Sequence, residues 1–200
     1  SQKKPPEKLL SKKAPHVAGK ALREYLSTPD YGGGRQFLDK WPVEEAPQIV
    51  AKVKSIEWPK SARAYVPGEG TCVGLTLGKD EKPRVYEQEQ AIDQLTRRVN
   101  AAVASWADKH APQGFGWTSV QINVNTSSEW HLDHRNVGPS ALLVVGDHVE
   151  GEFECKGFQP AKLDNELCVI DGRMWHRNHA AREGTRVSFV AFTQSAFRDA

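Results

Sequence analysis

The sequence predicts an α+β chain in which supporting helices come first and a jelly-roll barrel of short antiparallel strands follows. Three observations favour this arrangement. Residues 87–109 repeat apolar side chains at helical spacing, residues 120–125 alternate apolar and polar side chains, and turn residues divide the rest of the chain into short segments. Helices followed by a run of short strands are typical of this fold class.

Short helices are predicted over 19–28 and 45–54. The glycine triplet 32–34 between them lacks the strand-to-helix setting of a phosphate loop, so we interpret it as a hinge or turn. The clearest helix is 87–109, which carries one apolar stripe formed by Ile92, Leu95, Val99, Val103 and Trp106. This stripe is expected to pack against the outside of a sheet, with a partner-binding helix as the alternative.

The strands begin with residues 71–77. After residue 114 the period changes to two, because Val120, Ile122 and Val124 alternate with polar neighbours. Four further strands are predicted near 140–145, 151–155, 166–170 and 185–193, where Gly, Pro, Asn and Asp residues mark the turns between them.

Length and composition predict a single domain over 19–200, because 200 residues with 38% hydrophobic content can bury a core without disulfides. The three cysteines are odd in number and form no CxxC pair, which favours a reduced intracellular protein, nuclear or cytoplasmic. No apolar run reaches the length of a membrane span, so we expect no membrane partner. A monomer is expected.

Residues 1–18 form a basic segment that we expect to be a flexible arm. Residues 1–20 contain six lysines and one glutamate, a net charge of +5, which leaves −3 for the remainder of the chain. The arm could hold the phosphate backbone of a nucleic acid or act as a localisation signal. A solubilising tail, or the remnant of a longer chain, is an equally open interpretation.

A candidate metal site is formed by His131, Asp133 and a histidine further along, His176. Two histidines and one carboxylate can hold a ferrous ion on one face and leave three coordination positions open. Because His131 and Asp133 are two residues apart, an extended strand would direct both side chains to the same face.

Arg186 and Ser188 share one face of the last predicted strand, whose other face carries Val187, Phe189 and Ala191. A buried arginine is costly unless an anion neutralises it. The distal carboxylate of a dicarboxylate cosubstrate would be such an anion, and Ser188 could donate a second hydrogen bond to it. An internal pair with Asp or Glu is the alternative.

Residues 116–195 resemble the Fe(II)/2-oxoglutarate-dependent dioxygenase superfamily, and within it the TET/J-binding-protein branch, the oxygenases of methylated pyrimidines. The segments that carry the resemblance are 120–125, 131–133, 136–140, 151–153, 171–176 and 184–190. One departure is the single glycine, Gly151, where many relatives have a pair. The resemblance implies a double-stranded β-helix that holds Fe(II) at its mouth and uses 2-oxoglutarate and O2, with ascorbate as reductant.

The resemblance also implies roles for particular residues. His131, Asp133 and His176 would be the metal ligands and catalytic residues; His176 is preferred to His179 because its ten-residue distance from Arg186 matches the family's usual gap. Arg186 and Ser188 would bind 2-oxoglutarate, which is converted to succinate and CO2 while a substrate C–H bond is oxidised.

Several polar and aromatic residues near the motif have open interpretations. Asn123 and Asn125 either contact 2-oxoglutarate or the substrate, or satisfy turn backbone. Asn136 and Ser140 fit a loop that orients Asp133 or lines the pocket. The tryptophans that flank the motif either stack on an extruded base or pack in the core or at its rim; they are Trp117, Trp130 and Trp175.

Three functions are considered for a chain with these motifs. The first is oxidation of a modified nucleic-acid base such as 5-methylcytosine, with the basic arm contacting the backbone. The second is hydroxylation of a protein side chain or small molecule, which suits the net negative charge after residue 20. The third, a barrel that only binds metal or ligand, does not explain an intact triad with Arg186 behind it, and a zinc hydrolase would not need the arginine.

Overall fold

The structure is a computed structural model that describes residues 40–61, 63, 66–111, 115–133, 135–156 and 159–194. The basic arm predicted over 1–18, the helix predicted over 19–28 and the glycine turn at 32–34 lie outside the described residues. The other predicted elements can be compared with the structure.

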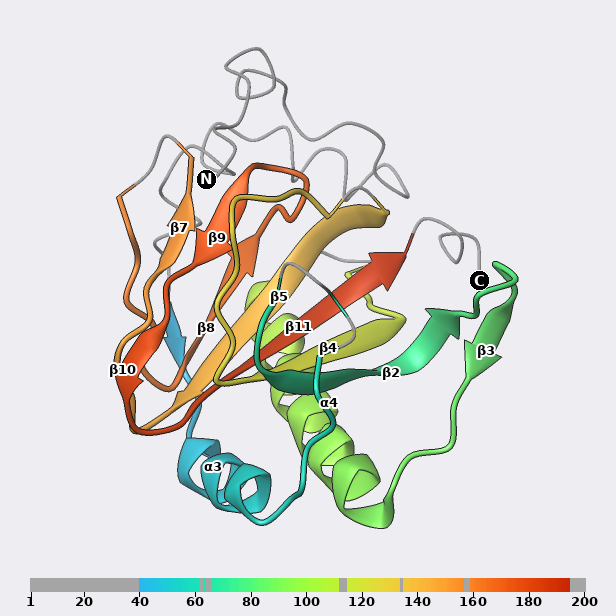
Figure 1. Cartoon of the computed structure of the whole chain (residues 1–200), viewed down its shortest axis with the longest axis horizontal. Coiled ribbons are helices and arrows are strands. Elements are labelled where there is room, and N and C mark those ends of the chain that lie inside the picture. The colour runs from blue at the N-terminus through green and yellow to red at the C-terminus, as the bar shows by residue number, and fades with distance from the viewer. Residues whose placement is uncertain are drawn as a thin grey trace.

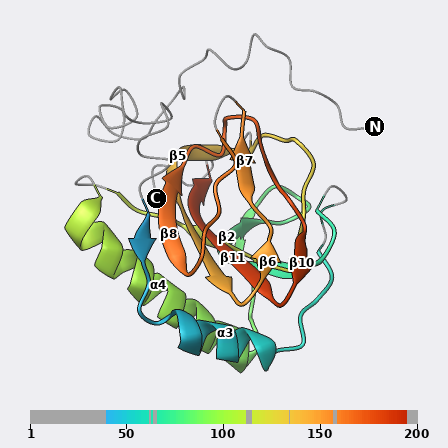
Figure 2. The ribbon, with the colours of Figure 1, turned by 90° about the vertical axis from the view of Figure 1, so that its left-hand side faces the viewer.

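One seven-stranded antiparallel sheet forms the framework of the fold (Figure 1). Two short antiparallel pairs, β10 with β6 and β7 with β9, form a second layer (Figure 2). The order of the large sheet is β1 (Trp41–Pro42), β8 (Glu166–Ile170), β5 (Asn136–Gly146), β11 (Arg186–Gln194), β4 (Ser119–Val124), β2 (Glu69–Leu77) and β3 (Pro83–Val85). The short strands are β6 (Val149–Glu150), β7 (Phe153–Cys155), β9 (His176–Asn178) and β10 (Ala181–Glu183).

Two helices cover one face of the large sheet, α3 (Ala46–Lys54) and α4 (Gln90–His110) (Figure 1). The predicted stripe of α4 is buried, and it shares a hydrophobic core with sheet residues such as Ile122 and Phe189. Each fully buried large apolar side chain contributes roughly 1.5–3 kcal/mol to stability. The expected packing of this helix against the sheet is therefore confirmed. Neither described helix combines the length and apolar character needed to cross a membrane.

Alternation along β11 divides the interior into two regions. Val187, Phe189 and Ala191 belong to the core beneath the helices, whereas Ser188 and Val190 face a cavity on the other side of the sheet. A smaller core lies between the two layers; its buried members are Leu142, Val144, Phe153, Cys155, Ala161, Leu163, Cys168 and Ile170. The predicted α+β chain with a jelly-roll core is confirmed.

The segment 136–140 differs from the prediction, because it is the start of β5 and not a loop. Its Gly-Pro pair suggested a break in the sequence. The strand continues through this pair because its pairing with β11 is irregular there. Gly138 has a φ of 74°, and the register shifts between Ala191 and Thr193. Proline is tolerated in a sheet at such bulges.

Candidate active site

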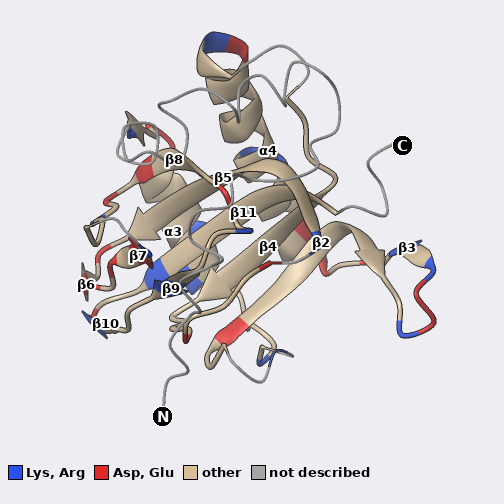
Figure 3. Cartoon of the chain, turned by 90° about the horizontal axis from the view of Figure 1, so that it is seen from above, with Lys and Arg blue, Asp and Glu red and all other residues tan. Residues whose placement is uncertain are grey.

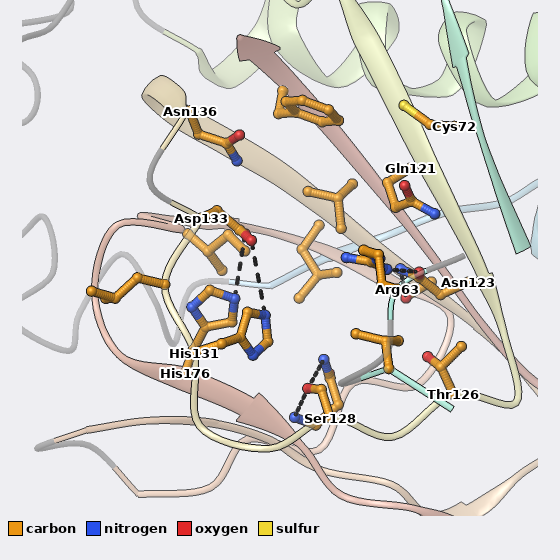
Figure 4. Close-up of a pocket in the computed structure, with 18 of the residues that line it drawn as sticks. Arg63, Cys72, Gln121, Asn123, Thr126, Ser128, His131, Asp133, Asn136 and His176 are labelled. Atoms are coloured by element: carbon orange, nitrogen blue, oxygen red, sulfur yellow. Dashed lines mark hydrogen bonds and ion pairs between the residues drawn. The ribbon is translucent and has the colours of Figure 1, made fainter. Parts of the chain in front are cut away.

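His131, Asp133 and His176 lie together at one end of the cavity (Figure 4). One ligand atom from each residue can be chosen so that all lie within 4.8 Å of one another. His176 Nε2 is 3.4 Å from Asp133 Oδ2, and His131 Nε2 is 3.9 Å from Asp133 Oδ1. The fold therefore brings together the three residues expected to hold a metal.

The local backbone that positions these residues was predicted incorrectly. Residues 131–133 do not form a regular strand; His131 forms an isolated bridge with His176, in which each backbone N–H donates to the other carbonyl, at 3.0 and 3.1 Å. The N–H of Asp133 donates to the carbonyl of Gly172 at 2.8 Å. Two separate attachments to 172–176, and not strand alternation, bring both side chains to the same place.

The second ring nitrogen of each histidine faces a backbone carbonyl. His131 Nδ1 is 2.7 Å from the carbonyl oxygen of Glu129, and His176 Nδ1 is 2.7 Å from that of Met174. A carbonyl oxygen can only accept, so Nδ1 carries the proton in the neutral ring and the lone pair is on Nε2. Both lone pairs then point toward Asp133, an arrangement typical of metal-binding histidines. The donor set fits a divalent cation.

The protonation of this cluster also suits a cation. Burial, reinforced by the neighbouring His176, lowers the pKa of His131 to about 4. Burial alone would raise the pKa of Asp133, but the hydrogen bond with His176 and the nearby positive charges bring it below its usual value. Burial opposes a charge on His176, yet its bond to Asp133 raises its pKa. An ionised carboxylate beside an unprotonated His131 is ready to bind a metal, which would displace the proton on His176.

The cavity beside the triad has a volume of about 470 Å³, within the range of small-molecule sites. Its walls include Asn123 from β4 and Ser188 from β11, with Asn178 from β9 (Figure 4 labels the first). Two arginines, Arg63 and Arg135, also line it. The cavity therefore carries positive side chains near the metal ligands, and the charge of Arg63 contributes to the lowered pKa values of His131 and Asp133.

Arg186 is a buried cation with unsatisfied donors. Its side chain is 1% exposed, and its Nη2 donates to Asn178 Oδ1 at 3.2 Å, while Nε and Nη1 have no hydrogen-bond partner. It forms no ion pair with any described residue; burial lowers its pKa to about 10, against a smaller opposing effect of Glu152. The internal ion pair considered from the sequence is therefore not observed in the described part of the chain. Unsatisfied buried donors of this kind fit a carboxylate ligand.

Gly151 makes room for the side chain of Arg186. Its φ is 79°, and a β-carbon at this position would lie 2.9 Å from Arg186 Cδ and 3.2 Å from Nε. Both the backbone conformation and the space require glycine here. This contact explains the glycine at the start of the 151–153 motif.

The two predicted asparagines have different surroundings. Asn123 lines the cavity, and its Nδ2 donates to Ser188 Oγ at 3.1 Å. Asn125 is exposed, has a φ of 51°, and accepts a hydrogen bond from the backbone N–H of Arg186 at 2.9 Å. Asn125 does not line the cavity, so the structure favours the turn interpretation for it over contact with a cosubstrate.

Two cavity residues that bond to predicted site residues were missed from the sequence. Asn178 lies two residues after His176 on β9, so the two-residue spacing used for Arg186 and Ser188 could have identified it. Arg63 precedes β2, and its Nη2 donates to Asn123 Oδ1 at 2.6 Å. Nothing in the local sequence around Arg63 indicates a contact across 60 residues.

The tryptophans near the motif do not line the cavity. Trp117 donates through Nε1 to Asn100 Oδ1 at 3.0 Å and packs against the core. The ring of Trp130 is covered by Arg177, whose Cζ lies 4.6 Å from the ring centroid. For Trp117 and Trp130 the packing interpretation is therefore favoured over base stacking.

Comparisons with known proteins agree with this fold. No family model matches the chain, and no curated protein is significantly similar to it in sequence. Among solved structures, it is similar to NgTET1 in complex with 5mC DNA, with 16% identity and a TM-score of 0.51 over 78% of this chain and 71% of that one. A 2OG-Fe(II) oxygenase family oxidoreductase from Burkholderia pseudomallei gives 15% identity and a TM-score of 0.56 over 88% and 92% of the two chains.

A Pseudomonas putida prolyl-4-hydroxylase follows at 14% identity and a TM-score of 0.49, over 77% of this chain and 90% of that one. Because the first two structures are only 16% and 15% identical to this chain, the similarity to them is one of fold. The chain has the fold of the 2OG-Fe(II) oxygenases, the double-stranded β-helix that its sequence motifs implied.

Proposed function

We propose that this protein is an Fe(II)- and 2-oxoglutarate-dependent oxygenase. The observation that carries the proposal is the combination, in one barrel, of a His-Asp-His cluster with a buried arginine that has no ion-pair partner among the described residues. A structural metal site would not need the arginine. A binding barrel without chemistry would not need three ligands arranged on one side.

In the proposed site, His131, Asp133 and His176 would hold iron at the end of the cavity. Bound iron, together with 2-oxoglutarate and O2, supplies the oxidative decarboxylation to succinate and CO2 and the oxidation of a substrate C–H bond. The protein fixes the ligands: Glu129 and Met174 orient the imidazoles through their carbonyl oxygens.

Arg186 and Ser188 would bind the distal carboxylate of 2-oxoglutarate. Asn178 now accepts the hydrogen bond of Arg186 and lines the cavity at this point. A carboxylate that reaches the guanidinium would replace the Asn178 carbonyl with a charged acceptor, which makes a stronger hydrogen bond. Asn178 would thus hold Arg186 in position before the cosubstrate enters.

We further propose that the substrate is a modified base of a nucleic acid, such as 5-methylcytosine. The fold likeness to NgTET1, which was solved with 5mC DNA, supports this class, as do the two arginines at the cavity, Arg63 and Arg135. A base within a duplex cannot reach a metal at the mouth of a barrel, so it must be flipped out or single-stranded. Unpaired cysteines at 72, 155 and 168 agree with a nuclear or cytoplasmic location.

Hydroxylation of a protein side chain or small molecule remains the second candidate. Figure 3 shows acidic and basic residues interspersed along the chain, as in the hairpin between β2 and β3, where Arg84 on β3 pairs with Asp80. Such mixed charge is not the continuous basic face that typifies nucleic-acid binding. Trp117 and Trp130 are also engaged in other contacts, with Asn100 and Arg177.

The test is succinate release with Fe(II), 2-oxoglutarate and ascorbate, coupled to mass spectrometry of methylated DNA and RNA for an added oxygen. We expect an oxidised base and no turnover in Asp133→Ala. If the basic arm holds phosphates, binding should weaken steeply with salt, and deletion of residues 1–15 should flatten that dependence. Succinate release with peptides or metabolites but no oxidised base would select the second candidate; no 2-oxoglutarate consumption with any substrate would reject the oxygenase.

A further inference from the structure

We propose that Arg63 is a positioning residue for the cosubstrate: through Asn123 it directs the hydroxyl proton of Ser188 toward the carboxylate that Arg186 binds. This inference rests on the proposed function. It adds a residue from the loop before β2, far from the sequence motifs, to the site.

The three side chains form a continuous hydrogen-bonded chain across the sheet. Arg63 Nη2 donates to Asn123 Oδ1 at 2.6 Å, and Asn123 Nδ2 is 3.1 Å from Ser188 Oγ. Asn123 and Ser188 are directly paired across β4 and β11, and they are only 8% and 2% exposed. Figure 4 shows Arg63 beside Asn123 on the wall of the cavity, facing the metal ligands.

The chemistry of these groups fixes the direction of every bond in the chain. A guanidinium has donors only, so the atom of Asn123 that faces Arg63 must be the carbonyl oxygen. The amide NH2 therefore faces Ser188, and because it too has donors only, the Ser188 hydroxyl oxygen must accept. The single hydroxyl proton of Ser188 is then left for another acceptor.

That acceptor is the carboxylate of the cosubstrate. Ser188 lines the cavity and lies two residues from Arg186 on β11, on the same strand face. No hydrogen bond from the Ser188 hydroxyl to another described side chain or carbonyl is found. Without Arg63, the Asn123 amide could turn over and take the hydroxyl proton on its own carbonyl oxygen. Arg63 thus keeps Ser188 a donor.

A direct role of Arg63 is the competing explanation, because this side chain also lines the cavity and its charge influences Cys72 on one side and Asp133 on the other. The two explanations predict different losses of 2-oxoglutarate affinity when both residues are replaced together. If Arg63 acts through Ser188, the loss of either residue removes the same hydrogen bond. If Arg63 contacts the carboxylate itself, the losses are independent and add.

The experiment measures the Kd of 2-oxoglutarate by isothermal titration calorimetry on the full chain loaded with Zn(II), so that no turnover is needed. The variants are Arg63→Met, Ser188→Ala and the double variant. A hydrogen bond to a charged group contributes enough to change Kd roughly ten- to a hundredfold, and each single variant should show a loss of this size. The double variant should bind no more weakly than Ser188→Ala. Arg63→Lys, which retains a donor for Asn123, should recover most of the affinity.

Arg135→Met is the matched control, because Arg135 lines the same cavity without bonding to Asn123. It should leave the Kd of 2-oxoglutarate unchanged, and Arg63→Met, which keeps all three metal ligands, should retain Zn(II) within a few fold of the wild-type affinity. Wild-type affinity in Arg63→Met, or additive losses in the double variant, would overturn the proposal. If Arg63→Met does not fold, Asn123→Leu replaces it in the same cycle with the same two outcomes. A wild-type protein that does not bind 2-oxoglutarate would instead reject the proposed function.

Discussion

Gly172 lies against the carboxylate of Asp133, so closely that a β-carbon on Gly172 would be 2.9 Å from Asp133 Oδ2. The carbonyl of Gly172 also accepts the backbone N–H of Asp133 at 2.8 Å. Gly172 thus holds the backbone of Asp133 by a hydrogen bond, and its lack of a side chain leaves the space that the Asp133 carboxylate occupies. The glycine in the 171–176 motif belongs to the metal site although it offers no ligand atom.

Gly172→Ala should weaken metal binding. The added methyl group would displace the Asp133 carboxylate from its place between the two histidines, and the loss of such a supporting contact lowers metal affinity roughly 10- to 100-fold. The affinity for Fe(II) or Zn(II) would be measured by competition with a chelator. Gly116→Ala is the control, because no atom lies within 4 Å of its would-be β-carbon. Equal affinity in both variants would show that the contact does not matter.

His176→Ala and His179→Ala should behave differently. His176 is buried in the triad, so its loss should abolish metal binding. His179 instead lies 2.7 Å from Glu154 through its Nε2, outside the triad, and its loss should leave the metal affinity within a few fold. Metal titration of both variants decides between them. A ligand-like loss in His179→Ala would mean that the two histidines had been assigned in reverse.

Arg186→Lys should raise the concentration of 2-oxoglutarate required for half-maximal activity. Lysine keeps the charge but cannot form the two parallel hydrogen bonds of a guanidinium. Each hydrogen bond to a charged group contributes roughly 1.5–3 kcal/mol, so the shift should be about one to several orders of magnitude. The dependence of succinate release on 2-oxoglutarate measures it, with kcat and the thermal midpoint as controls for the fold. Unchanged dependence would remove Arg186 from the cosubstrate site.

The three thiols should be unreactive in the native protein. Burial raises the pKa of Cys72 to about 11 and the pKa values of Cys155 and Cys168 to about 12. A raised pKa keeps the thiol protonated, and the thiolate is the reactive form, so alkylation at pH 8 should be slow and should accelerate only as the pH approaches these values. Mass spectrometry of iodoacetamide-treated protein, native and in urea, would show this. Rapid labelling of native Cys72, which lines the cavity, would contradict it.

Much of the fold could be predicted because its elements carry strong local periodicity. The apolar stripe of α4 and the alternating side chains of β4 are patterns that repeat along the sequence. These two elements and the strand β8 lie where the sequence predicted them. The two-residue strand β1 and the three-residue strands β3, β9 and β10 were not predicted. Segments this short have too few residues for a period to be recognised.

The candidate site, like the fold, could be predicted only in part. His131, Asp133 and His176 could be chosen because their spacing is a motif, but the backbone that joins them could not. An isolated bridge between His131 and His176 has no sequence pattern, since it depends on how the loop that carries His131 meets the start of β9. Arg63 was missed for a related reason: its partner, Asn123, lies across the sheet and not nearby in the sequence.

The strand pair that carries the proposed ligand His176 is much smaller than the sheet beneath it. β7 and β9 share three residue pairs, whereas β5 and β11 share eight and are backed by helices. Amide protons of β5 and β11 should therefore exchange with solvent only through global unfolding, and those of β9 through local opening. A divalent ion that ties His176 to His131 would oppose that opening, so metal should slow hydrogen exchange in β9 while exchange through local motions elsewhere stays the same. The slowing of hydrogen exchange in β9 would then report the free energy with which the metal binds.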